Sequence, residues 1–60
     1  MLEITVIMRN DEGQLESTTI EGVKWFHTYA EGGYSVVGYI DTTGYRGTLY
    51  GLIVIVHRSK

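Results

Sequence analysis

The sequence predicts an α+β fold in which a four-stranded antiparallel sheet carries one helix on one face, in the order ββαββ. Three observations lead to this fold class. Apolar residues alternate with polar ones near the N-terminus, two similar turn motifs mark two hairpins, and an amphipathic segment with helix-capping signals lies between them. The 60 residues form one domain over residues 1–60.

The first hairpin is predicted from residues 2–18. Leu2, Ile4, Val6 and Met8 alternate with mostly polar neighbours, as in a half-buried strand. Residues 10–13 read Asn-Asp-Glu-Gly, which combines turn-forming residues with a glycine at the fourth position. The return strand is expected over residues 14–18, and its polar character suits the edge of a sheet.

Residues 19–31 can be read as helix or as strand. Many of their side chains favour strands by intrinsic propensity, among them Val23, Trp25 and Tyr29. At about 100° per residue, however, the charged residues gather on one side of a helix. Thr18-x-x-Glu21 matches a capping box, and Gly32 stands where a helix would end. These signals favour a helix; the alternative is an all-β five-stranded meander or small barrel.

The second hairpin is predicted after residue 33. Residues 34–41 form its first strand, and residues 41–44 repeat the earlier turn chemistry, with Asp first and Gly fourth. The last strand is expected over residues 48–57. Gly47 and Gly51 are candidate positions for a bulge or bend, because glycine weakens a straight strand.

Residues 49–56 contain no charged residue, so both faces of the last strand are expected to avoid water. One helix covers only one face of a sheet, and a soluble monomer rarely exposes a large apolar patch. The sequence therefore predicts a homodimer that stacks the uncovered faces. The predicted interface residues are Ile7, Val37, Tyr39, Ile53 and Ile55. A sheet curled into a small barrel is the competing solution.

Aromatic residues are the most distinctive feature of the composition. Five tyrosines accompany Trp25 and Phe26, and such rings dominate the energetics of binding interfaces. Tyr45 and Arg46 stand side by side in or after a turn, where contact residues often occur. The predicted binding residues are Tyr45, Arg46, Tyr50, Tyr39 and Trp25, with burial in a helix-to-sheet core as the competing interpretation for Trp25.

Three short segments resemble the helix-to-strand region of a small phage-encoded antitoxin that blocks a host RNA-cleaving toxin. They are Val23-x-Trp25, Tyr29-Ala30-Glu31 and Tyr39-Ile40-Asp41, within about a third of the chain. The resemblance implies that the helix face and the adjoining strand form a toxin interface. No correspondence is found before residue 19 or from residue 42 onward.

Several kinds of site are not expected. The absence of cysteine excludes disulfides and thiolate metal sites. His27 and His57 lack the spacing of metal ligands, and neither common phosphate-binding glycine loop is present, so no metal site, catalytic residue or cofactor is predicted. The sequence pI of about 5.5 argues against a nucleic-acid partner. With no signal-peptide pattern and no long apolar run, we expect a cytoplasmic protein without membrane contact.

The function predicted from these features is that of a non-enzymatic protein-interaction module. We expect a small homodimeric inhibitor or antitoxin-like accessory protein, of phage or mobile-element type, that binds and masks a host protein. One alternative is a homodimer that binds a small molecule or nucleotide at the subunit interface through Tyr45, Arg46 and Tyr50. Another alternative is a structural subunit of a larger oligomer.

Overall fold

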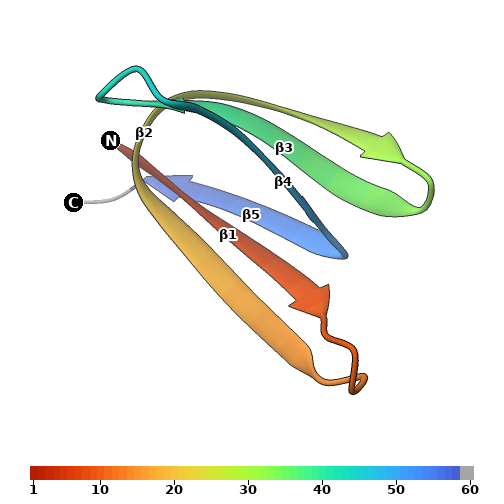
Figure 1. Cartoon of the computed structure of the whole chain (residues 1–60). Coiled ribbons are helices and arrows are strands. Elements are labelled where there is room, and N and C mark those ends of the chain that lie inside the picture. Colours follow the sequence, from red (N-terminus) through yellow and green to blue (C-terminus); the bar gives the residue numbers. More distant parts are fainter. Residues whose placement is uncertain (59–60) are drawn as a thin grey trace.

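The computed structural model describes residues 1–58 and shows one antiparallel sheet of five strands, with no helix among those residues (Figure 1). The strands are β1 (Leu2–Arg9), β2 (Leu15–Glu31), β3 (Tyr34–Asp41), β4 (Arg46–Gly51) and β5 (Ile53–Arg58). Their order across the sheet is β4-β3-β2-β1-β5. The predicted α+β fold is therefore wrong, and the all-β five-stranded meander named as the alternative describes the chain.

The segment predicted as a helix belongs to β2, a strand of 17 residues. The strand propensities of Val23, Trp25 and Tyr29 prevail because β2 has a pairing partner along its whole length. Its first half pairs with β1 and its second half with β3. The glycine interpreted as a helix end has another role: Gly32 and Gly33, with φ of 58° and 83°, connect β2 to β3. Positive φ at both positions of a two-residue loop is the mark of a type I′ hairpin turn.

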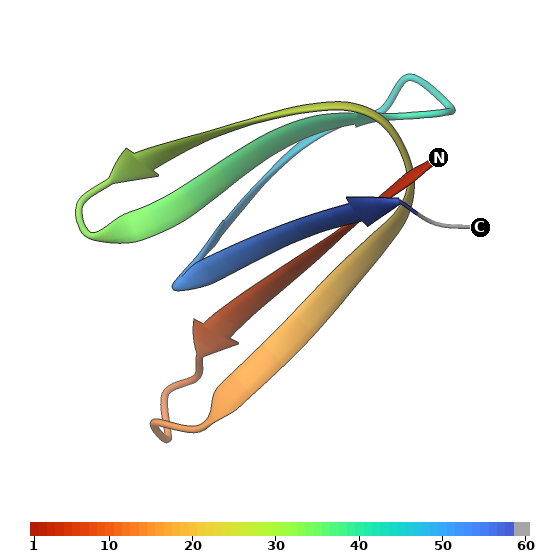
Figure 2. The ribbon, with the colours of Figure 1, turned by 180° about the vertical axis from the view of Figure 1, so that it is seen from behind.

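β2 changes partner at a bend centred on Gly22. The φ of Gly22 is 69°, and the pairing register with both neighbouring strands shifts beside it. The Gly22 carbonyl accepts a hydrogen bond of 3.0 Å from the N–H of Thr42. Figure 2 shows the consequence: the long β2 curves around one end of the molecule, so that β3 and β4 face β1 and β5.

The core lies between these two halves of the curled sheet. Its fully buried members are Ile4, Val6, Val23 and Val37, together with Tyr39, and seven partly buried apolar side chains pack against them. The two halves of the sheet thus cover each other's inner face, which was expected to be covered by a helix. The partly buried residues are Leu2, Met8, Ile20, Phe26, Leu49, Val54 and Val56.

The two predicted turns, at residues 10–13 and 41–44, are confirmed, and in both an Asn or Asp side chain accepts hydrogen bonds from the turn backbone. In the first, Oδ1 of Asn10 accepts hydrogen bonds of 2.9 Å from the N–H groups of Glu12 and Gln14. In the second, Oδ1 of Asp41 accepts hydrogen bonds of 2.8 Å and 3.0 Å from the N–H groups of Thr43 and Tyr45. An oxygen placed this way holds the turn without help from other elements.

The predicted last strand is broken into two. β4 ends at Gly51 and β5 begins at Ile53, and the two strands lie at opposite edges of the sheet. At the corner, the N–H of Leu52 donates a 2.8 Å hydrogen bond to the carbonyl of Ile7. One continuous strand over residues 48–57 is therefore wrong, whereas Gly51 as a bend position is confirmed.

Candidate functional site

The outer surface of β2, β3 and β4 presents three rungs of directly opposed residues. Directly opposite residues of antiparallel strands point to the same face with their side chains in contact range. The first rung has Trp25 as its β2 residue, the second has His27 and the third has Tyr29. We call the whole surface the aromatic face; its rungs are Trp25–Ile40–Arg46, His27–Gly38–Thr48 and Tyr29–Val36–Tyr50.

The rings along β2 form a continuous row. The ring centroids of Trp25 and His27 lie 5.2 Å apart, and those of His27 and Tyr29 lie 5.8 Å apart with nearly parallel planes at 12°. The imidazole of His27 covers Gly38, where an added Cβ would come within 2.6 Å of Cε1. The row is therefore held by ring contacts and by a missing side chain on β3.

The third rung encloses a valine outside the main core. Val36 has no exposed surface although it points outward, and its opposite neighbours on both sides are tyrosines. The Tyr29 and Tyr50 rings flank it and remain about half exposed, at 46% and 52%. This packing keeps both rings in place while leaving one side of each ring open to a partner.

A shallow hollow of about 180 Å³ lies over the first two rungs, between the β2 row and β4. Trp25 is 52% exposed at its rim. Arg46, on the opposite rim, has no ion-pair partner among residues 1–58, where the described ion pair joins His57 and Glu3. An exposed indole thus faces a guanidinium whose charge is available to a partner.

A second apolar surface lies on the outside of β1 and β5. Ile7 is directly opposite Ile53, and Ile55 stands one rung further along β5. Ile53 and Ile55 are 52% and 45% exposed. We call Ile7, Ile53 and Ile55 the aliphatic face. These three were predicted as interface residues, whereas the structure places Val37 and Tyr39, predicted with them, in the core.

The predicted binding residues separate into two groups. Trp25, Arg46 and Tyr50 share the aromatic face. Tyr45 lies in the β3–β4 turn, exposed, with its ring 6.4 Å from that of the buried Tyr39. Burial raises the pKa of the Tyr39 phenol, with smaller contributions from Tyr45 and Asp41. Tyr39 therefore supports the core and presents little surface to a ligand.

His27 and Tyr29 were not predicted as site residues. The signal that could have found them is the alternation of large rings at positions 25, 27 and 29, which places them on one face of a strand. A helix interpretation spreads the same residues around its axis. The toxin-contacting helix face that the antitoxin resemblance implies is likewise absent, because these residues are part of β2.

The side chains of the aromatic and aliphatic faces are of types that bind another molecule by surface contact. Rings, aliphatic groups and one guanidinium are suited to binding through burial and charge-assisted hydrogen bonds. Within residues 1–58, no three His, Cys, Asp or Glu side chains are grouped to hold a metal ion. That same part of the chain contains no helix long and apolar enough to cross a membrane.

Comparison with models of known families, with curated proteins and with solved structures gives no match for this chain.

Proposed function

We propose that the chain is a non-enzymatic protein-binding module whose aromatic face contacts the partner. The observation that carries the proposal is the half-exposed Trp25 across Ile40 from Arg46, which has no ion-pair partner among residues 1–58. Trp, Tyr and Arg are the residue types that most often dominate binding energy at protein interfaces. Because these residues are on paired strands, little backbone conformational entropy is lost on binding.

The charge of the chain favours a protein over a nucleic acid as the partner. The net charge is −2, and Arg46 is the one formally charged residue among the nine of the aromatic face. Nucleic-acid binding draws most of its affinity from several Lys or Arg side chains that contact phosphates. A surface of rings with a single cation is better suited to an apolar protein surface that carries a carboxylate.

We further propose that two copies associate through the aliphatic face, leaving both aromatic faces free. An edge strand with exposed isoleucines, such as β5, invites pairing with another strand. A standard interface covers about 800 Å² on each partner, which is roughly a fifth of the 4427 Å² accessible surface. In this arrangement the dimer masks a host protein, as an inhibitor does. The cytoplasmic location expected from the sequence stays a prediction.

The aromatic-face proposal is tested with Trp25→Ala and Arg46→Ala, using Tyr45→Ala as the matched control. Tyr45 is an exposed ring outside the aromatic face. Tyr45→Ala therefore also removes a large exposed side chain, but it leaves the aromatic face intact. Tagged chains are incubated with cell lysate, and captured proteins are quantified by mass spectrometry. We expect a partner whose capture falls about fivefold or more with either face variant and is unchanged in the control.

A partner bound equally by all four chains, or lost only with Tyr45→Ala, would contradict the proposal. Circular dichroism of each variant shows that the sheet is intact, so that loss of capture reports on the contact itself.

A further inference from the structure

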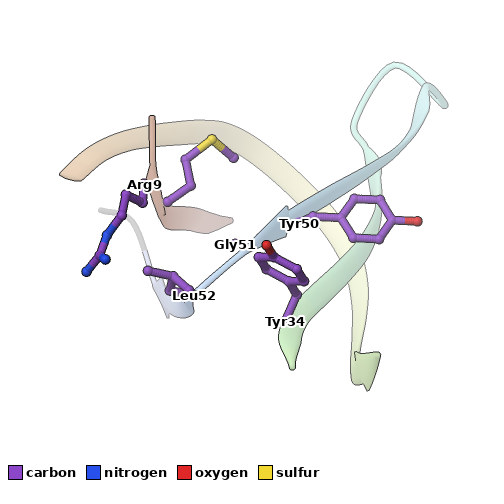
Figure 3. Close-up of a pocket in the computed structure, with 6 residues that line it drawn as sticks. Arg9, Tyr34, Tyr50, Gly51 and Leu52 are labelled. Atoms are coloured by element: carbon purple, nitrogen blue, oxygen red, sulfur yellow. The ribbon is translucent and has the colours of Figure 1, made fainter. Parts of the chain in front are cut away.

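A larger hollow of about 480 Å³ lies at the corner where β4 meets β5, and Tyr50 is the one residue that it shares with the aromatic face. Its lining comes from the end of β1, the start of β3 and the corner itself. Small-molecule pockets usually measure about 300–1,000 Å³, so this hollow is large enough for a ligand. The lining residues are Met8, Arg9, Tyr34, Tyr50, Gly51 and Leu52 (Figure 3).

Gly51 forms the bare centre of this pocket. In Figure 3, Arg9 and Leu52 lie to one side of Gly51 and Tyr34 lies to the other with its ring next to Gly51, whereas the Tyr50 side chain points away from Gly51. A side chain at this position would collide with Val6 and approach the Ile7 carbonyl oxygen at 2.9 Å. The Gly51 backbone therefore packs directly against β1 on that side, and the pocket lies where the chain turns from β4 to β5.

The side-chain polar groups of Arg9, Tyr34 and Tyr50 have no hydrogen-bond or ion-pair partner within residues 1–58. Arg9 is the one charged residue in the lining, and its guanidinium has no ion pair among residues 1–58. The hydroxyls of Tyr34 and Tyr50 form no hydrogen bond with that part of the chain either. A guanidinium donates paired hydrogen bonds to carboxylate, sulfonate or phosphate oxygens.

We propose that this pocket binds a small anion built on a flat apolar ring system. The ring system lies over Gly51 between the Tyr34 ring and the side chains of Met8 and Leu52, with Tyr50 at the edge of the pocket. The anionic group accepts hydrogen bonds from Arg9. The site differs from the ligand set predicted from the sequence, because Arg46 and Tyr45 are outside it and only Tyr50 belongs to both.

The test uses 1-anilinonaphthalene-8-sulfonate, a fluorescent ring system with one sulfonate, titrated against the full chain. We expect saturable binding of one probe per chain. Arg9→Gln should weaken binding about tenfold or more, because it removes a charge-assisted hydrogen bond. Arg46→Gln is the matched control, with the same charge change on the aromatic face, and should leave the affinity unchanged.

N-phenyl-1-naphthylamine, which has the same rings without the sulfonate, separates the two parts of the site. It should bind Arg9→Gln and the unaltered chain equally well. Amide chemical shifts measured with the sulfonate probe should change most at Gly51 and Leu52. Equal affinity of the sulfonate probe for Arg9→Gln and the unaltered chain, or equal weakening by Arg46→Gln, overturns the proposal. Either result leaves the aromatic-face proposal untouched, since Arg9 is not part of that face.

Discussion

At the scale of single residues, glycines decide where strands and side chains approach each other most closely. Gly38 and Gly51 both have ordinary backbone angles, and an added Cβ would meet an obstacle at either position. The obstacles differ. At Gly38 it is the far end of the His27 ring, which can rotate away, whereas at Gly51 it includes the Ile7 backbone.

This difference predicts unequal effects of two chemically identical changes. Gly51→Ala should lower the free energy of unfolding by about 1–3 kcal/mol, because overpacking against a backbone has no local relief. Gly38→Ala should change it by less than about 1 kcal/mol, since His27 can move and alanine lowers the entropy of the unfolded chain. Urea unfolding monitored by circular dichroism measures both. Equal losses would show that the corner at Gly51 is not tightly packed.

Asp41 makes the stability of the β3–β4 turn depend on pH. The side-chain hydrogen bond from the Thr43 hydroxyl, at 2.6 Å, is the main cause that lowers the pKa of this carboxyl below its usual 3.8. Desolvation is the second-largest effect and opposes this shift, and the backbone N–H groups of Thr43, Tyr45 and Gly44 each lower the pKa by a smaller amount. Hydrogen bonds to the ionised form account for this direction.

A lowered pKa in the folded state stabilises the fold above the unfolded-state pKa of about 3.8. That contribution is lost as the pH falls through the lower, folded-state value. We therefore expect the urea midpoint to fall on acidification from about pH 4 to about pH 2, and to fall less in Asp41→Asn.

Asp11→Asn is the control for the acid dependence. Asp11 lies in the first turn, where Asn10 accepts the hydrogen bonds instead. Its removal should leave the dependence as it is in the unaltered chain. An Asp41→Asn midpoint that falls as steeply as that of the control would contradict the role assigned to Asp41.

At the scale of elements, β2 is the strand on which the architecture depends. Its two halves belong to different parts of the curled sheet, and the bend between them is made at Gly22, whose φ is 69°. An L-residue in this left-handed conformation costs roughly 1–2 kcal/mol, and asparagine tolerates it better than alanine.

The bend predicts a rank order among Gly22 variants. Gly22→Ala should be destabilised by about 1–2 kcal/mol, and Gly22→Asn by less. Space does not limit either change, because an added Cβ meets only Oγ1 of Thr42, at 3.7 Å. Glu21→Ala, at the exposed neighbouring position, should change stability by less than about 0.5 kcal/mol. Thermal unfolding gives the ranking, and an alanine variant as stable as the asparagine variant would argue against backbone strain at the bend.

The same element explains why the helix prediction failed. Within residues 19–31, the charged side chains do gather on one side of a hypothetical helix, and Thr18 with Glu21 does match a capping box. Both signals are local, and a capping residue contributes only about 1 kcal/mol. Pairing with β1 and β3 supplies backbone hydrogen bonds and packing along all of β2, which outweighs them.

At the scale of the whole molecule, curling buries one face of the sheet and leaves the other exposed. The inner face makes the core, while the outer face carries the aromatic and aliphatic faces. A second copy would cover the aliphatic face without disturbing the core.

The proposed dimer predicts that Ile55→Lys sediments as a monomer at micromolar concentration, while the unaltered chain sediments at twice its 6.8 kDa. The side chain is exposed, so a lysine should cost little folding stability but cannot be buried at an interface unpaired. Thr28→Lys, at another exposed strand position, is the control and should remain dimeric. Sedimentation of the unaltered chain as a monomer would exclude this dimer.

The local chemistry of this protein is determined by its sequence. Residues 10–13 and 41–44 form the predicted turns because one Asn or Asp oxygen can satisfy the neighbouring N–H groups by itself. The strand at residues 34–41 is found as predicted, because its apolar and β-branched side chains favour an extended chain. Trp25, Arg46 and Tyr50, predicted as binding residues from residue type and position, are exposed, and their role in binding stays a prediction.

Only the tertiary structure decides which face each of these residues occupies. Val37 and Tyr39 enter the core because β2 bends at Gly22 and the sheet closes over itself. Trp25, His27 and Tyr29 form one row because strand pairing prevails over the helix in this segment. The pocket beside Arg9 likewise combines residues 8–9 with residues 34 and 50–52. Contacts between distant segments follow from the pairing and curvature of the whole sheet. These depend on the free energies of strand pairing and core packing, which cannot be read from a local sequence pattern.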